Sequence, residues 1–319
     1  MIKKWFAFFL KFLVSGGLIW LLLGSVDLDA AWERISDARP GPLIAVVAAY
    51  TFQILIIVWR WQAILVAMNI DLPFRKIFTF TYIGMFFNQA LPSAVGGDAV
   101  RIYKVYKSGT LLSRAINSVM LDRVATVLAL VLLALFAVPF FLDKVGDAEA
   151  RWILPGVILL ALGGFAGVVL LMVLDKMPSR ISHYRLVRGM AALAADTRSV
   201  FLSPRHALTV MVVSLIGHAN ITFGAYLIGL SLDLGIDWVD YMVLMPPVML
   251  LVTLPISIGG WGVREGAMVA AFALIGVPAE GILVLSILFG LVAILIALPG
   301  GVVWLLSGER KISLDQART

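Results

Sequence analysis

Long runs of apolar residues alternate with short polar segments along the chain, and the length of these runs predicts membrane-spanning helices. A helix needs about 20 apolar residues to cross the roughly 30 Å hydrocarbon layer of a bilayer. Six runs are long enough to span: residues 5–23, 42–68, 115–142, 152–174, 206–232 and 281–306. Two more, residues 77–91 and 241–255, contain only fifteen residues each. These two are too short to cross comfortably.

A repeated motif lies at the end of each short run. Residues 91–101 read LPSAVGGDAVR and residues 254–264 read LPISIGGWGVR, so six of eleven positions are identical. Proline stops a helix, and paired glycines allow the chain to turn tightly. We therefore predict that each short run enters the membrane, breaks at the motif and returns as a second short helix.

The positions of the basic residues favour these re-entrant hairpins. Cytoplasmic loops of membrane proteins are enriched in lysine and arginine. With both hairpins re-entrant and both termini cytoplasmic, eighteen of the 25 basic residues lie on the cytoplasmic side and four in outer loops. If residues 77–95 crossed fully, Arg101, Lys104, Lys107 and Arg114 would lie outside. The net charge of +6 is thus explained by loop charges, without a nucleic-acid partner.

The same layout predicts an all-α integral membrane protein built from two inverted-topology repeats, with about six full spans and two re-entrant helical hairpins. Each half reads span, span, hairpin, span, and three crossings turn the second half upside down relative to the first. We expect a single membrane domain over residues 1–319, with the first repeat in 1–145 and the second in 146–308. A cytoplasmic linker is expected at residues 175–205.

Composition narrows the chemistry. Apolar residues make up 61% of the chain, charged residues 14%, and the mean hydropathy is +1.02, far from the values of a soluble domain. The absence of cysteine excludes disulfides, thiolate metal sites and cysteine nucleophiles. Three histidines in separate segments give no clustered ligands, so we predict no metal and no cofactor. No phosphate-binding motif of the G-x-x-x-x-G-K type occurs, so transport would be passive or coupled to an ion or proton gradient.

The broken helices predict an anion site near the middle of the membrane. A helix N-terminus carries free N–H groups and a positive dipole end, and two such ends would face each other at depth. Arg101 and Arg264 lie about one turn into the two outgoing helices and add positive charge. The residues predicted to bind substrate are Arg101, Arg264, Gly96, Gly97, Gly259, Gly260, Ser93, Asn88, Arg60, Arg123, Asp122 and Glu265.

Several of these residues also have a purely structural interpretation. Arg60 could extend to the membrane interface, and Asn88 could satisfy loose carbonyls at the first break. Asp122 and Arg123 could form a structural ion pair, because an unpaired charge at that depth would cost about 3 kcal/mol. Glu265 could pair locally with its neighbour or titrate during transport.

Three further residues are candidates for proton coupling. His218 and Asn220 are strongly polar within an apolar span, where the alternative role is a hydrogen bond between helices. Asp98 is expected to cap the first outgoing helix, and its counterpart in the second motif is Trp261. Lys104 and Lys107 share that outgoing helix with Arg101, and the three are expected to attract anionic headgroups at the inner surface.

The segments LPSAVGGDAVRIYKV and LPISIGGWGVREGA, together with Arg60-Trp61 and the LDR sequence ending at Arg123, resemble the membrane domain of lysylphosphatidylglycerol synthase/flippase proteins. The resemblance covers nearly the whole chain and implies a bacterial inner-membrane protein related to lipid flippases. We expect no soluble aminoacyl-transferring domain after Leu306, so lysyl-lipid synthesis is not implied. Stand-alone members are associated with polyprenyl-phosphate carriers or hopanoid-type lipids, so the cargo stays open.

Taken together, these patterns predict translocation of an anionic or phosphate-bearing lipid between leaflets, by alternating access of two inverted halves, and no enzymatic activity. The partners implied are membrane lipids with an anionic headgroup or of the polyprenyl-phosphate type. Two alternatives stay open: an intramembrane enzyme that modifies a lipid phosphate, and a non-transporting partner that holds a biosynthetic enzyme at the membrane.

Overall fold

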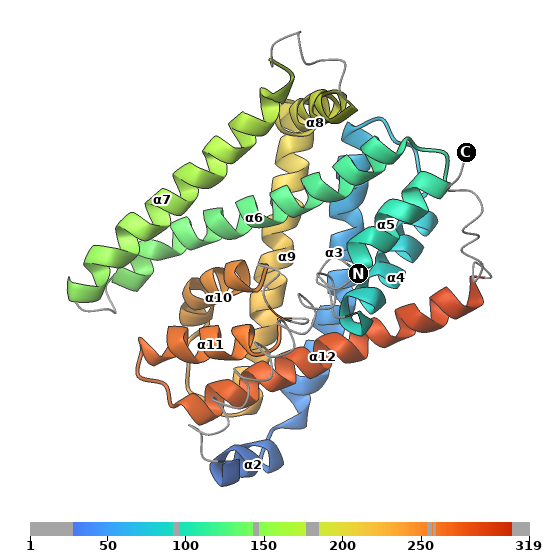
Figure 1. Cartoon of the computed structure of the whole chain (residues 1–319). Coiled ribbons are helices and arrows are strands. Elements are labelled where there is room, and N and C mark those ends of the chain that lie inside the picture. The colour runs from blue at the N-terminus through green and yellow to red at the C-terminus, as the bar shows by residue number, and fades with distance from the viewer. Residues whose placement is uncertain are drawn as a thin grey trace, which may run out of the picture.

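The computed structural model describes residues 28–91, 96–142, 147–176, 185–253, 257 and 260–307. Within these ranges every regular element is a helix (Figure 1). Four helices are long and apolar enough to span a membrane: α3 (Pro40–Ala67), α6 (Leu112–Leu142), α9 (Pro204–Ser231) and α12 (Ala279–Leu306). The prediction of an all-α membrane protein is confirmed. The predicted span at residues 5–23 lies outside the described residues.

Both short apolar runs form broken helices. The first is α4 (Phe74–Ala90) followed by α5 (Gly96–Lys107), and the two helices pack against each other. The second is α10 (Trp238–Thr253) followed by α11 (Val263–Ala273), which also pack together. Neither run continues as a single rod, as the proline and glycine pair of each motif predicts. In Figure 1 the broken ends of the two pairs point toward the middle of the molecule.

Helices α3 and α9 form the centre of the fold and run antiparallel. At one end, the backbone N–H of Arg39 donates to the carbonyl oxygen of Ser231 at 2.9 Å. Further along, the hydroxyl of Tyr50 donates to the carbonyl oxygen of Ile221 at 3.3 Å. Positions near the start of α3 thus contact positions near the end of α9, and both hairpins are arranged around this pair (Figure 1).

Corresponding elements recur in the two halves of the chain. Helices α3 and α9 have 28 residues each, and both have a proline in their first turn. Each is followed shortly by a residue with a left-handed backbone, Asn69 and Asp233, both with φ of 53°. A broken hairpin and then a long helix come next in either half, in the same order. Local geometry therefore repeats along with the element order.

The remaining elements lie at the periphery. Helix α2 (Leu28–Ser36) and helix α8 (Arg185–Phe201) lie at opposite ends of the α3–α9 pair (Figure 1). Helix α7 (Asp147–Met172) matches the predicted span 152–174 and packs along α6, and the short η1 (Leu174–Lys176) follows it. The predicted linker thus contains a helix, which is anchored by buried Leu193 and Val200. Hydrogen bonds to Asp175 hold the pKa of the Arg198 guanidinium above its ordinary value.

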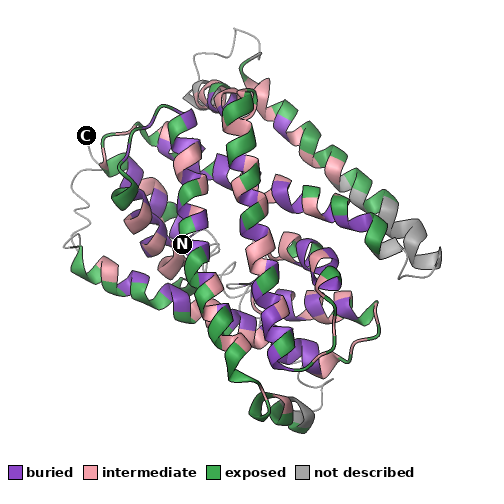
Figure 2. Ribbon diagram, turned by 180° about the vertical axis from the view of Figure 1, so that it is seen from behind, coloured by how far each residue is buried: buried purple, intermediate pink, exposed green. Residues whose placement is uncertain are grey.

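Burial is concentrated where the hairpins meet the long helices (Figure 2). Helix α12 contacts both hairpins through glycines. A Cβ on Gly300 would meet the backbone of Tyr82 in α4, and a Cβ on Gly290 would meet the guanidinium of Arg264 in α11. One long helix is thereby fitted against two hairpins that belong to different halves of the chain.

Helices α4 and α5 cross where Gly84 of α4 lies against Gly97 of α5. A Cβ on Gly97 would lie 2.6 Å from the Asn88 side chain and would also meet the carbonyl oxygen of Gly84. Neither the backbone nor an amide that is held by a hydrogen bond can move away cheaply in a packed interior. The glycine pair of the first motif lies inside α5, so it allows close helix crossing rather than forming the turn that we expected there.

We expect Gly97→Ala to destabilise the first hairpin by about 1–3 kcal/mol, because the added methyl overpacks the crossing. The measurement is the thermal midpoint of the detergent-purified protein. Gly167→Ala in α7 is the matched control, since a Cβ there meets nothing within 4 Å. Equal midpoints for the two variants would contradict the proposed crossing.

Candidate functional site

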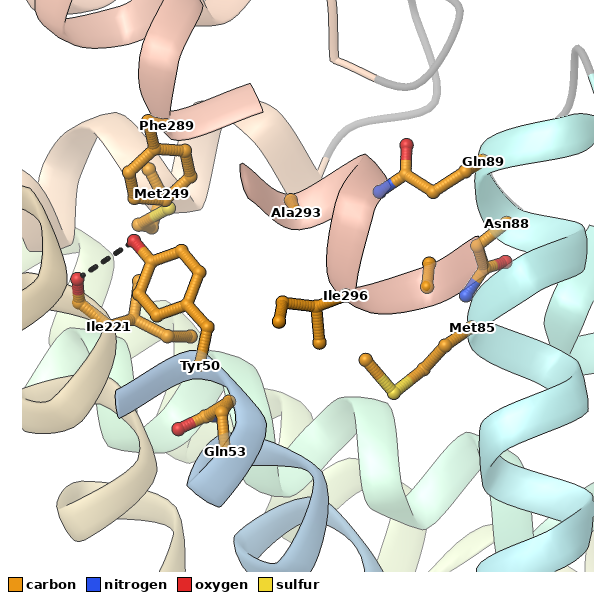
Figure 3. Close-up of a pocket in the computed structure, with 11 residues that line it drawn as sticks. Tyr50, Gln53, Met85, Asn88, Gln89, Ile221, Met249, Phe289, Ala293 and Ile296 are labelled. Carbon is orange, nitrogen blue, oxygen red and sulfur yellow. Dashed lines mark hydrogen bonds between the residues drawn. The ribbon is translucent and has the colours of Figure 1, made fainter. Parts of the chain in front are cut away.

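A cavity of about 250 Å³ lies at the centre of the molecule, between the broken ends of the two hairpins (Figure 3). Five helices contribute to its wall: α3, α4, α9, α10 and α12. The lining residues are Tyr50, Gln53, Met85, Asn88, Gln89, Ile221, Met249, Phe289, Ala293, Ile296 and Ala297. Of the candidates chosen from the sequence, Asn88 lines this cavity.

Four of the lining side chains are polar, and none is charged: Tyr50, Gln53, Asn88 and Gln89. The carboxamide of Gln53 extends from the middle of α3, a helix that is otherwise strongly apolar. A carboxamide at that depth is the signal by which the sequence could have marked this residue. Gln89 follows Asn88 directly at the end of α4, so the same break places both amides at the cavity (Figure 3).

Asn88 holds the first break together. Its side-chain oxygen accepts a hydrogen bond from the backbone N–H of Gly97 at 2.8 Å. This satisfies one of the free N–H groups at the start of α5. We expected Asn88 to satisfy free carbonyl groups, but it accepts a hydrogen bond from a free N–H group instead. Asp98 was expected to cap α5, but its carboxylate binds Arg123.

A cluster of five charges lies beside this break, and four of its members have side chains that are at most 11% exposed. Asp122 accepts hydrogen bonds from Arg60 at 2.7 Å and from Arg101 at 2.9 Å. Asp98 accepts two from Arg123, at 2.8 and 3.0 Å. Arg101 also approaches Asp98 at 3.6 Å, which joins the two groups. Three guanidinium groups face two carboxylates, so the cluster carries an excess positive charge.

Arg101 is the most enclosed arginine of this cluster. Its side chain is 7% exposed, and its guanidinium lies over the ring of Trp61, 4.0 Å from the ring centroid. The Nε of Arg101 and the indole N–H of Trp61 have no hydrogen-bond partner among the described residues. Lys104, one turn further along α5, is buried as well. The expectation that Arg101 and Lys104 face lipid headgroups is therefore wrong, because both pack inside the protein.

The second hairpin places Arg264 in a neutral setting. Its guanidinium donates to Glu265 at 2.5 Å and to Ser286 at 3.1 Å, and it lies 4.6 Å from the ring centroid of Trp261. Glu265 also accepts the backbone N–H of Gly262 at 2.5 Å and so caps the start of α11. Glu265 thus pairs with its neighbour, which is one of the two roles considered for it.

The first N–H groups of α5 and α11 were predicted to bind an anion, and the described residues show which groups bind two of them. The N–H groups of Gly97 and Gly262 are bound by the protein's own side chains, so these two donors are already occupied. Gly96 is buried, and Gly260 adopts φ of 84°, which favours glycine. Two of the predicted residues, Ser93 and Gly259, lie outside the described part of the chain.

Arg60 forms an ion pair with Asp122 at 2.7 Å, and its side chain is only 11% exposed. Asp122 and Arg123 are both ion-paired, but with partners on other helices rather than with each other. Asn220 bonds the backbone oxygen of Ala49 and the side chain of Gln53, both at 2.9 Å, which confirms the interhelical hydrogen bond.

His218 lies 7% exposed in α9, and neither ring nitrogen has a hydrogen-bond partner in the described structure. No group of three or more histidine or acidic side chains that could hold a metal ion occurs among the described residues.

These features define a class: an all-α membrane protein in which two broken helices meet at a central cavity. Residues 8–301 match the family model described as the lysylphosphatidylglycerol synthase TM region. The chain belongs to this family, which confirms the resemblance found in the two motifs and indicates a lipid-related role in the membrane.

Two archaeal proteins are similar to this chain. A UPF0104 membrane protein of Pyrococcus horikoshii is 24% identical over 198 residues, which cover 61% of this chain and 56% of that protein. A UPF0104 membrane protein of Methanothermobacter thermautotrophicus is 24% identical over 262 residues, 73% of this chain and 74% of that protein. The chain thus matches just over half of the length of the Pyrococcus protein.

We expect Asp122→Asn to lower stability by about 3–5 kcal/mol, because it leaves the buried guanidinium groups of Arg60 and Arg101 without a countercharge. The thermal midpoint in detergent measures the effect. Asp233→Asn is the control: its ion pair with Arg39 is solvent-exposed, and such pairs contribute about 0–1 kcal/mol. A midpoint for Asp122→Asn within the error of the control would show that the cluster does not stabilise the fold.

Proposed function

We propose that the protein moves a lipid with an anionic or phosphate-bearing headgroup between the two leaflets, without changing its covalent structure. The observation that carries this proposal is the central cavity at the meeting point of both hairpins. It lies at the core of an apolar helical protein, yet four polar side chains line it. A polar headgroup needs such a place to cross the hydrocarbon layer while its tails remain in lipid.

The charge next to the cavity supports an anionic headgroup. Asn88 lines the cavity and bonds Gly97, and the next residue is Asp98 of the five-charge cluster. On another side, Phe289 lines the cavity and its ring centroid lies 5.6 Å from the guanidinium of Arg264. The cluster, with its excess positive charge, is therefore connected to the cavity wall through Asn88 and the start of α5. A negative headgroup in the cavity would be attracted to it through a medium of low dielectric constant.

Two inverted repeats would give such a cavity access from both sides. The recurrence of element order and backbone geometry in the two halves supports an internal repeat. The antiparallel contact of α3 with α9, which are the corresponding helices, supports opposite orientations of the two halves. In transporters of this kind, one half rocks against the other around a fixed central site.

The orientation in the membrane follows from the basic loops. We propose that the protein lies in a bacterial inner membrane, with both termini and residues 175–205 in the cytoplasm. The first hairpin would then enter from the cytoplasmic side and the second from the outer side. The energy source would be the lipid gradient itself or an ion or proton gradient.

The topology can be read with single cysteines, because the native chain has none. We expect Asp71→Cys and Lys107→Cys, at the two ends of the first hairpin, to react with an impermeant maleimide only from the cytoplasmic side. Asp237→Cys and Pro278→Cys, which flank the second hairpin, should react only from outside. Labelling of the two ends of either hairpin from opposite sides would refute re-entry.

Translocation is tested in liposomes that contain the purified protein and a tail-labelled anionic phospholipid. Quenching of the outer leaflet by dithionite reports exchange between leaflets. We expect Ala293→Trp to reduce exchange to the rate of protein-free liposomes, because the indole would fill the cavity. Leu295→Trp, on an exposed part of the same helix, is the control and should keep the native rate.

The same liposomes separate the other functions. Recovery of a chemically altered headgroup would identify an enzyme and overturn the proposal. Unaltered lipid with no exchange by the native protein would favour a non-transporting partner. Exchange that persists in Ala293→Trp would place the lipid path outside the cavity.

A further inference from the structure

We propose that the central cavity recognises an uncharged, hydroxyl-bearing portion of the headgroup, beyond the phosphate. This inference rests on the proposed translocation of a lipid headgroup and adds the chemical class that the cavity selects. It is argued from the orientation of the amides that line the cavity and from the absence of charged side chains among the residues that line it.

Two of the amides have their orientation determined by the backbone. The oxygen of Asn88 must face Gly97, because it accepts that backbone N–H. The amide nitrogen of Asn220 must face the carbonyl oxygen of Ala49, and the same nitrogen donates to the oxygen of Gln53. An amide whose oxygen is engaged presents its NH2 group elsewhere. Asn88 and Gln53 therefore each present donor hydrogens that no described group accepts.

Two more groups provide acceptors at the same cavity. The hydroxyl of Tyr50 donates to Ile221 over a long 3.3 Å, which leaves its oxygen lone pairs free. Gln89 makes no hydrogen bond with the described residues and lies exposed at the cavity, with both ends of its amide available (Figure 3). The cavity thus combines fixed donors with adjustable acceptors.

This combination matches hydroxyl groups better than either kind of ion. A hydroxyl both donates and accepts, so it can use both sets of groups. An ammonium group only donates and would meet the NH2 groups of Asn88 and Gln53. A bare phosphate only accepts and would lose its hydration in a cavity that no arginine lines; Arg101 and Arg264 of the two hairpins are already bonded to carboxylates. The phosphate of a larger headgroup can instead remain toward the cluster.

A pair of lipids with equal charge tests the idea. Tail-labelled phosphatidylglycerol and phosphatidylpropanol carry the same phosphodiester and the same three-carbon headgroup, but only the first has free hydroxyls. We expect the native protein to exchange phosphatidylglycerol about tenfold faster, which corresponds to one or two net hydrogen bonds. A tail-labelled phosphatidylethanolamine should exchange more slowly than phosphatidylglycerol.

Two variants link the preference to the cavity. Gln89→Leu removes an amide that no hydrogen bond ties to the fold, so the folded structure should be retained. Gln53→Leu removes one of the fixed donors. Within each variant, phosphatidylglycerol and phosphatidylpropanol should exchange at equal rates. Gln62→Leu, on the same helix as Gln53 but away from the cavity, is the control and should keep the tenfold preference.

The outcomes separate this inference from the proposed function. Equal rates for the two lipids in the native protein would overturn hydroxyl recognition and leave translocation intact. A tenfold preference that survives in both Gln89→Leu and Gln53→Leu would also overturn it, because the selecting groups would lie elsewhere. Exchange of neither lipid by the native protein would overturn the proposed translocation and this inference together.

Discussion

Backbone N–H groups that are hidden from water must find an acceptor, and this constraint governs both broken helices. Each break exposes the first N–H groups of an outgoing helix inside an apolar protein, where an unsatisfied group costs several kcal/mol. The two hairpins meet the constraint with different residues. In the first, the acceptor is Asn88 on the incoming helix; in the second, it is Glu265 on the outgoing helix itself.

The two halves share a framework but differ in charge. Arg101 and Arg264 hold equivalent places in the motif, and each bonds a residue of the long helix that follows, Asp122 and Ser286 respectively. The serine cannot neutralise an arginine, so Glu265 supplies the charge from the neighbouring position. The result is a neutral group in the second half and a net positive cluster in the first. A cavity between them is electrostatically asymmetric although its supporting helices recur.

The sequence was most informative where length and backbone chemistry decide the outcome. Fifteen-residue apolar runs that end in proline and paired glycine can hardly be unbroken spans, and both proved to be helix pairs. The buried charges were identified as such, but their partners were not, because Arg60 and Asp122 are 62 residues apart and only tertiary packing joins them. Gln53 and Gln89 were missed, although a carboxamide within an apolar helix could have marked Gln53, because no sequence pattern places it beside Asn88 and Gln89. Both residues line the cavity only because the fold brings five helices together around it.

The fit of α12 against both hairpins has a mechanical consequence. Gly290 is fitted to the second hairpin and Gly300 to the first, with no room for a methyl group at either position. Relative movement of the hairpins must therefore flex the segment between these two anchors, where Ala293, Ile296 and Ala297 form one wall of the cavity. Pro299 lies inside the helix and leaves the carbonyl of Leu295 without its intrahelical bond, which softens the rod at this place. Bending of α12 would therefore change the shape of the cavity at the same time.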